Sequence, residues 1–220
     1  MHVLYLHGFV SSPSGGKAQV LRDLLTAAGV TFEAPDLNEP AFETLTTSRM
    51  IGQVEAAIAA APPGPVVLIG SSLGAFVAWH VAARAVLRRT RAVDRLVLLA
   101  PALELDWSTF PGLAGDGLRR WRETGTLDVF HFAYGRPARI GYALYDDARQ
   151  YDSRAAAVSV PTLIFQGRRD DLVDPRMVEA FAASRPNVTL HVFDDDHRLQ
   201  ASLGPIFRET AAFLGLSAPA

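Results

Sequence analysis

The most specific chemical signal in the sequence is the stretch GSSLG at residues 70–74, which has the pattern G-x-S-x-G. An apolar, β-branched run at 66–69 precedes it, and an apolar helical run follows it. A sharp turn from strand to helix holds such a serine on a strained backbone, and the two glycines permit an approach that side chains would block. The pattern predicts that Ser72 is a nucleophile for acyl transfer, with Ser71 only a residue of the turn.

A serine nucleophile needs a histidine base and an acid, which follow in the order acid and then histidine, each on a loop after a strand. After the apolar run at 162–166 comes Asp170, three residues before Val173, and after the run at 188–193 comes His197. We expect Asp170 to be the acid and His197 the base. The neighbouring Asp171 is the alternative acid, since only one of the two side chains can readily point at the histidine.

None of the other five histidines lies on a loop that follows a strand later in the chain than the acid. His2, His7, His80 and His191 are interpreted as packing or surface residues. His131 could contact a substrate, but it does not follow a strand in the required order. The acids before His197 are interpreted as solvated or capping residues, because no further ligands with suitable spacing complete a metal site. No metal is predicted.

Acyl transfer also needs backbone amides that stabilise the negative charge on the former carbonyl oxygen. One amide is expected from Leu73, the residue after the nucleophile. The other is expected from the turn after the first strand, where Gly8 lets the chain bend and expose the amide of Phe9. The alternative for this turn is a plain junction between a strand and a loop.

Short apolar runs recur along the chain and predict the strands that must position these residues. They lie at residues 3–6, 31–34, 66–69, 96–99, 162–165 and 189–193, and most are apolar on both faces. Helical spacing appears at 51–61 and 207–214, Asp174-Pro175 is a helix-start signal, and Gly215 is a helix-stop signal. The alternation predicts a mostly parallel sheet covered by helices on both faces.

Residues 101–159 interrupt this alternation, because they contain no convincing buried strand. We expect a small cap inserted into a single domain that spans residues 1–220. Aromatic residues are scattered through the insertion among glycines and prolines, and they include Trp107, Phe110, Phe130 and Phe132. Two interpretations stand: these rings wall an apolar acyl pocket, or they bury the cap against the body of the domain.

The composition of the 220 residues suits one soluble globular domain. The formal net charge is −2, from 21 basic and 23 acidic residues, so no strong field favours nucleic acid. The sequence contains no cysteine, which excludes disulfides and a cysteine nucleophile. No apolar run reaches the roughly 18 residues of a membrane span. We therefore expect a cytoplasmic protein with a small, roughly neutral substrate.

Four segments together resemble a known family: LYLHGFVSSPSGGKA at the start, GSSLGAFVA, GRRDDLVDP and DDDHRL. In this order they are similar to the α/β-hydrolases, and within them to the small YqiA-like serine esterases. GSSLG and DHRL are also similar to small serine thioesterases that remove acyl groups from proteins. The resemblance implies a minimal α/β-hydrolase fold. The chain departs from larger relatives because it opens at the strand before the oxyanion turn, so we expect about six strands without their two leading antiparallel strands.

The resemblance assigns the triad roles to Ser72, Asp170 and His197, and the oxyanion roles to Phe9 and Leu73, with no cofactor. It implies a carboxylic ester hydrolase. Alternatives on the same residues are an acyl-protein or acyl-CoA thioesterase, a serine aminopeptidase, a carbon–carbon bond hydrolase and a cofactor-free haloperoxidase. A catalytically silent binding protein is the alternative from another class. The sequence favours no particular oligomeric state, acyl length or leaving group.

Overall fold

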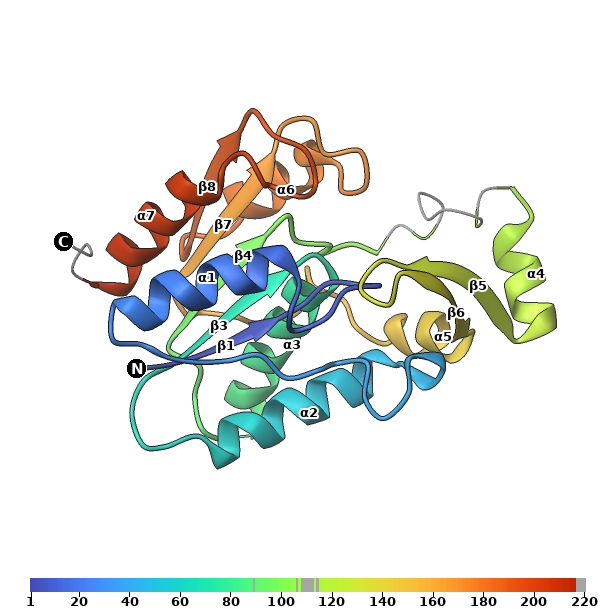
Figure 1. The fold of residues 1–220 in the computed structure, drawn as a ribbon, viewed down its shortest axis with the longest axis horizontal. Helices are drawn as coiled ribbons and strands as arrows, with labels where there is room; N and C mark the ends of the chain where they lie inside the picture. Colours follow the sequence, from blue (N-terminus) through green and yellow to red (C-terminus); the bar gives the residue numbers. More distant parts are fainter. Residues whose placement is uncertain (89, 106, 108–112, 114, 217–220) are drawn as a thin grey trace.

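The computed structural model describes residues 1–88, 90–105, 107, 113 and 115–216. Its main sheet has six parallel strands in the order β2-β1-β3-β4-β7-β8 (Figure 1). Their bounds are β1 His2–Leu6, β2 Thr31–Glu33, β3 Val66–Ser71, β4 Arg95–Leu99, β7 Thr162–Gly167 and β8 Val188–Phe193. This confirms the mostly parallel sheet of six strands.

Each strand coincides with an apolar run of the sequence within one or two residues at either end. The inner strands β1 and β3 are buried along their whole length, whereas the edge strand β2 is short and largely exposed. β1 begins at His2, one residue before the apolar run at 3–6 that predicted this strand. The Nε2 atom of His2 lies 3.3 Å from a carboxylate oxygen of Glu33 at the end of β2.

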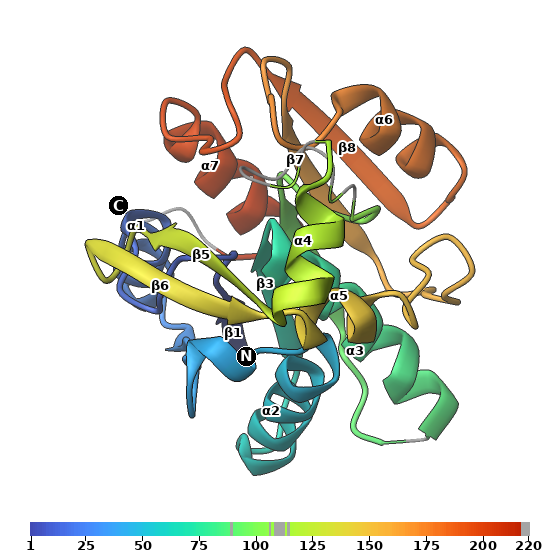
Figure 2. The same cartoon turned by 90° about the vertical axis from the view of Figure 1, so that its right-hand side faces the viewer.

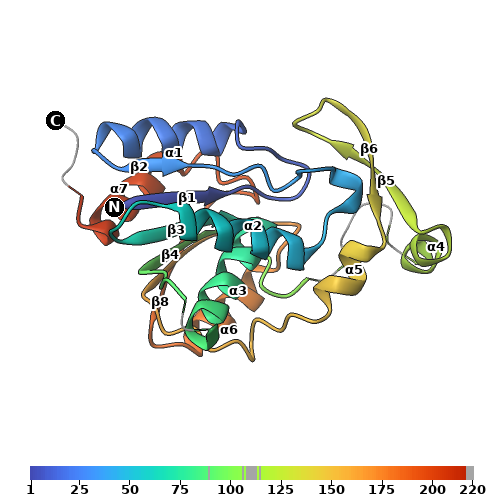
Figure 3. The ribbon, with the colours of Figure 1, turned by 90° about the horizontal axis from the view of Figure 1, so that it is seen from below.

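Helices cover both faces of the sheet (Figure 3). One face packs against α1 Gly16–Ala27 and α7 Leu203–Leu214, through inward side chains such as Val3 and Tyr5. The other face packs against α2 Thr47–Ala60, α3 Leu73–Arg88 and α6 Pro175–Ala183, through side chains such as Leu4 and Leu6. This alternation follows from the period of two in a strand, and it places two apolar layers around the sheet.

The predicted helix signals have the expected geometry. Asp174 is the N-cap of α6, where its side chain accepts a hydrogen bond from the amide of Arg176 at 2.9 Å, and Pro175 is the first helical residue. Gly215 ends α7 in the left-handed conformation, with φ of 69°. The start of α6 and the end of α7 could therefore be predicted from local residue chemistry.

The segment between β4 and β7 forms a separate unit beyond the carboxyl ends of the main strands (Figures 1 and 2). It contains α4 Gly117–Thr124, an antiparallel hairpin of β5 Thr126–His131 and β6 Arg136–Gly141, and α5 Ala143–Ala148. A short 3-10 helix, η1 Phe42–Thr44, packs against β6. None of these strands joins the main sheet, as the lack of a convincing buried strand in 101–159 indicated.

Candidate active site

Ser72 occupies the turn between β3 and α3 with a φ of 52°, a left-handed conformation that is unusual for a residue other than glycine. The flanking glycines explain why the turn can be so tight. A Cβ atom at Gly70 would lie 2.5 Å from Cα of Ala75, and one at Gly74 would collide with the carbonyl oxygen of Leu6. The turn is therefore a nucleophile-elbow geometry that requires glycine on both sides.

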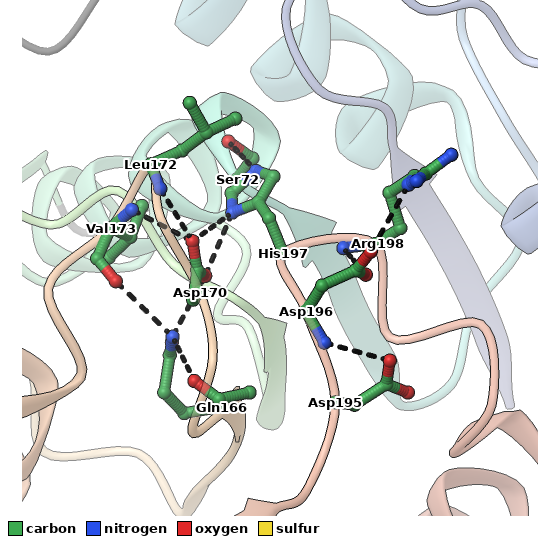
Figure 4. Close-up of polar contacts among 10 residues, drawn as sticks. Ser72, Gln166, Asp170, Leu172, Val173, Asp195, Asp196, His197 and Arg198 are labelled. Atoms are coloured by element: carbon green, nitrogen blue, oxygen red, sulfur yellow. Dashed lines mark hydrogen bonds and ion pairs between the residues drawn. The ribbon is translucent and has the colours of Figure 1, made fainter.

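His197 and Asp170 meet Ser72 at the carboxyl edge of the sheet (Figure 4). Nε2 of His197 lies 3.1 Å from Oγ of Ser72, a residue 125 positions earlier in the chain. Nδ1 of the same ring lies 3.0 and 2.9 Å from the two carboxylate oxygens of Asp170. A carboxylate only accepts, so Nδ1 donates to Asp170, and Nε2 is left to accept from the hydroxyl of Ser72.

The carboxylate of Asp170 is buried and fully engaged. Its Oδ1 accepts from the amides of Leu172 and Val173, both at 2.9 Å, and its Oδ2 accepts from Nε2 of Gln166 at 2.8 Å. Burial by itself raises the pKa of Asp170, but the hydrogen bond from His197 and these amides outweigh burial and lower it. The group therefore stays ionised. The alternative acid, Asp171, is exposed, so the side chain that meets His197 is Asp170.

The loop that carries His197 is held by the acids that precede it. Asp195 is 5% exposed, and its two carboxylate oxygens accept from the amides of Asp196 at 2.8 Å and Ser202 at 2.9 Å. A Cβ atom at Gly167 would lie 2.5 Å from the carbonyl oxygen of Asp196, so this loop packs directly on the end of β7. The interpretation of Asp195 as a capping acid agrees with these contacts.

The two predicted oxyanion residues belong to the turns that follow β3 and β1. Leu73 is the first residue of α3, whose earliest helical hydrogen bonds come from the amides of Ala75 and Phe76 to the carbonyl of Ser72. Phe9 follows the turn after β1, and a Cβ atom at Gly8 would lie 3.4 Å from Cβ of Ser72. The turn after β1 therefore lies against Ser72.

The predicted substrate-binding aromatics separate into two environments. Trp107 is buried, and its ring lies 5.8 Å from that of Trp121, inside the 101–159 segment. Phe130 and Phe132 are 51% and 75% exposed, with their rings 5.4 Å apart. Phe110 lies outside the described residues. The 101–159 segment therefore has a buried aromatic interior as well as exposed rings on its hairpin.

The hairpin also approaches the turn after β1. The amide of Ala133, at the hairpin tip, donates to the carbonyl of Val10 at 3.4 Å. The ring of Phe42 packs against Phe9 at 5.5 Å and against His131 at 4.7 Å. His131 is thus a packing residue between the hairpin and the loops that follow β1 and β2.

Sequence reasoning missed two polar residues near Asp170. Gln166 is fully buried near the end of β7, where a polar residue in an otherwise apolar strand was the available signal. Lys17 is half-buried at the start of α1. Burial lowers the pKa of Lys17 to about 8, against the opposing pull of Asp170, Asp196 and Asp195. Its proximity to these acids depends on tertiary structure, which no local pattern indicates.

The described part of the chain contains no group of three or more histidine, cysteine, aspartate or glutamate residues placed to hold a metal ion. None of its helices combines the length and apolar character that crossing a bilayer requires.

The sequence model described as "Uncharacterised protein family (UPF0227)" matches residues 2–214. The chain belongs to this family. No curated protein matches the UPF0227 chain. The match spans Ser72, Asp170, His197 and the 101–159 segment.

Solved structures resemble the UPF0227 chain along nearly all of its length. A provisionally named hydrolase from Agrobacterium vitis S4 is 26% identical, with a TM-score of 0.83 over 96% of this chain and 87% of its own. Mouse alpha/beta hydrolase domain-containing protein 10 is 19% identical, with a TM-score of 0.78 over 97% and 89%. A monoacylglycerol lipase from Paleococcus ferrophilus is 17% identical, with a TM-score of 0.76 over 97% and 93%. The UPF0227 chain is therefore an α/β-hydrolase.

Proposed function

We propose that this α/β-hydrolase is a serine carboxylic ester hydrolase that works through an acyl-enzyme at Ser72. The observation that carries the proposal is the continuous hydrogen-bonded chain from Ser72 Oγ through His197 to Asp170, with contacts of 2.9 to 3.1 Å. Each group has the donor or acceptor role that nucleophilic acyl transfer needs. The resemblance to proteins named as a hydrolase and a lipase supports the same class.

In the acylation step, Oγ of Ser72 attacks the carbonyl carbon of the ester while its proton passes to Nε2 of His197. A bond forms between Oγ and the acyl carbon, and the electron pair of the C=O bond moves onto the oxygen. When the tetrahedral intermediate collapses, the C–O bond to the alcohol breaks, and His197 returns the proton to the leaving alkoxide. Asp170 stabilises the charged imidazole throughout and does not itself take the proton.

Deacylation repeats these steps with water as the nucleophile. His197 takes a proton from water, whose oxygen attacks the acyl carbon, and the proton then goes to Oγ of Ser72 as the carboxylic acid leaves. The amides of Leu73 and Phe9 are the proposed donors to the oxyanion in both steps. Leu73 is the first residue of α3, so the dipole at the N-terminus of this helix also stabilises the negative charge. No cofactor is required.

We propose that residues 101–159 form a cap, and that the exposed aromatic pair on its hairpin, Phe130 and Phe132, faces the substrate. Trp107 stabilises the cap from within, since it is buried against Trp121. Phe130 and Phe132 offer exposed apolar surface on the hairpin whose tip contacts Val10, next to the oxyanion turn. This position suits contact with the acyl or alcohol part of a small ester.

The reaction class can be tested with a substrate panel on the purified chain and on Ser72→Ala. The panel contains nitrophenyl esters of increasing acyl length, acyl-CoA thioesters and an aminoacyl anilide. We expect the esters to be hydrolysed with the highest kcat/KM, and Ser72→Ala to lose this activity. The matched control is Ser71→Ala, a buried neighbour outside the triad, which should keep it.

The alternatives give different profiles in the same panel. A preference for the thioesters would identify a thioesterase, and a preference for the anilide an aminopeptidase. A folded wild-type chain that hydrolyses none of them, or that is unaffected by Ser72→Ala, would contradict the proposal.

A further inference from the structure

His7, the residue after β1, is 3% exposed and uses both ring nitrogens on the backbone. Its Nε2 lies 3.0 Å from the amide nitrogen of Leu37, and its Nδ1 lies 2.9 Å from the carbonyl oxygen of Gly8. A backbone N–H can only donate, so Nε2 accepts from Leu37. The proton of the neutral ring is then on Nδ1, which donates to the Gly8 carbonyl.

The contact with Gly8 persists if the ring gains a second proton. Asp36 places a carboxylate oxygen 3.2 Å from Nε2 of His7, close enough to accept a hydrogen bond once Nε2 carries a proton. A proton added to Nε2 would therefore meet a carboxylate in place of the Leu37 amide. Nδ1 carries a proton in both forms of the ring, so it can donate to Gly8 in both.

The carbonyl of Gly8 and the amide of Phe9 belong to one peptide group. That group is planar, and in a trans peptide its C=O and N–H bonds point in opposite directions. A hydrogen bond that holds the Gly8 carbonyl on the side of His7 therefore also fixes the direction of the Phe9 N–H. The same turn lies against the turn that carries Ser72, since a Cβ atom at Gly8 would contact Ser71 O at 3.2 Å and Ser72 Cβ at 3.4 Å.

We propose that His7 is a positioning residue for the oxyanion site: by donating from Nδ1 to the Gly8 carbonyl, it orients the amide of Phe9 toward the reacting carbonyl oxygen. The inference rests on the proposed function, because an oxyanion forms only if Ser72 attacks an acyl carbon. It assigns a role to a histidine that the sequence interpretation left among packing or surface residues. His7 does not contact the substrate and acts through the backbone alone.

The local backbone explains why such a positioning contact is needed. Val10, two residues after Gly8, has a φ of 51°, which is unfavourable for a β-branched side chain. The described turn belongs to no regular strand or helix between β1 and α1. Side-chain contacts must therefore hold its conformation, and His7 Nδ1 is bonded to the carbonyl of the peptide that carries the Phe9 amide.

The test compares two variants that each keep one half of the imidazole. The side-chain amide nitrogen of His7→Asn occupies about the position of Nδ1, so it can still donate to Gly8 but cannot reach Leu37. The side-chain amide oxygen of His7→Gln occupies about the position of Nε2, so it can still accept from Leu37 but leaves the Gly8 carbonyl without its donor. Both variants remove the ring, which makes them controls for each other.

We expect His7→Gln to lower kcat for ester hydrolysis by about 10-fold or more, with KM nearly unchanged, because a misaligned oxyanion donor weakens the transition state and not substrate binding. His7→Asn should keep kcat within about threefold of wild type on the same reasoning. A boronic acid that forms a tetrahedral adduct with Ser72 should lose affinity for His7→Gln by about the factor lost in kcat/KM. If His7→Gln does not fold, His7→Ala against His7→Asn makes the same comparison.

Equal kcat values for the Asn and Gln variants, or unchanged boronic acid affinity in the Gln variant, would overturn the role of His7. These outcomes are distinct from a failure of the proposed function, which would appear as wild-type hydrolysis that is absent or independent of Ser72. In that case both proposals would be wrong. Thermal unfolding of the two variants at equal concentration separates an effect on kcat from a loss of folded protein.

Discussion

The ring of His197 faces Asp170 with one nitrogen that lies almost equally far from both carboxylate oxygens, at 3.0 and 2.9 Å. Because those oxygens also accept from two backbone amides and from Gln166, the carboxylate cannot easily turn away from the ring. This contact fixes which ring nitrogen carries the proton, and so leaves Nε2 as the acceptor that faces Ser72.

Asp170→Asn should therefore nearly abolish turnover without unfolding the protein. An asparagine can present its NH₂ group to Nδ1, which favours the tautomer that places the proton on Nε2. We expect kcat to fall about 10³- to 10⁴-fold, the size of effect that loss of this orientation causes in other serine hydrolases. The matched control is Asp171→Asn at the exposed neighbour, which should keep kcat within about twofold. Equal losses in the two variants would contradict the assignment of the acid.

The glycines at the Ser72 turn should be intolerant of a single methyl group. A Cβ atom at Gly70 would lie 2.5 Å from Cα of Ala75, in backbone that cannot move independently, so Gly70→Ala should cost about 3 kcal/mol of unfolding free energy or more. The matched control is Gly52→Ala in α2, where no atom lies within 4 Å, and it should gain about 0.5 to 1 kcal/mol. Urea denaturation measures both. A Gly70→Ala variant as stable as wild type would contradict the described turn.

The burial of His80 predicts that the folded protein loses stability in mild acid. Its ring is 5% exposed, its Nε2 lies 3.1 Å from Oγ of Ser153, and burial lowers its pKa to about 4 against a weaker opposing effect of Asp152. In the unfolded chain the pKa is about 6.5, so between those values the unfolded state binds more protons and acid favours it. Between pH 7 and pH 5, protonation of His80 in the unfolded chain should lower the unfolding free energy by about 2 kcal/mol.

The variant His80→Phe isolates that contribution. It retains an aromatic ring for the packing against Phe76 and Tyr151 but cannot titrate. We expect it to be somewhat less stable than wild type at pH 7, because Ser153 loses its partner, and to lose about 2 kcal/mol less between pH 7 and pH 5. Urea denaturation at the two pH values tests this. Equal pH dependence in wild type and variant would show that His80 is not buried in its neutral form.

The exposed aromatic pair on the hairpin should affect substrate use more than stability. The double variant Phe130→Ser and Phe132→Ser removes rings that are 51% and 75% exposed, so the melting temperature should change little. If the rings contact the acyl group, kcat/KM should fall about 3- to 10-fold for long acyl esters and stay near wild type for acetate. The control is Leu87→Ser. It removes a 78% exposed side chain near the C-terminal end of α3, whereas Ser72 precedes the N-terminal end of this helix. An unchanged chain-length profile would contradict contact with substrate.

Much of the main sheet could be predicted because its strands are apolar on both faces and alternate with helices. The hairpin β5–β6 could not, since its residues are mostly half-buried or exposed and leave no continuous apolar run. The order of Ser72, Asp170 and His197 was evident from motif and position. The choice between Asp170 and Asp171 depends on the turn in which the amides of Leu172 and Val173 draw one carboxylate inward.

The contacts of His7 and Gln166 were beyond sequence reasoning for a different reason. His7 depends on the amide of Leu37, which approaches only when β1 and β2 pair. Gln166 reaches Asp170 because the loop after β7 folds back over the strand end. In each case the partner is set by tertiary structure, and a residue type in a strand or turn does not reveal it.

The central claim, that Ser72 is an activated nucleophile, is tested most directly by reaction with a fluorophosphonate probe followed by mass spectrometry of the modified peptide. We predict stoichiometric labelling on Oγ of Ser72 in the folded wild-type chain and in Ser71→Ala, and none in Ser72→Ala. Folded protein that remains unlabelled, or that is labelled equally when Ser72 is replaced by alanine, would contradict it.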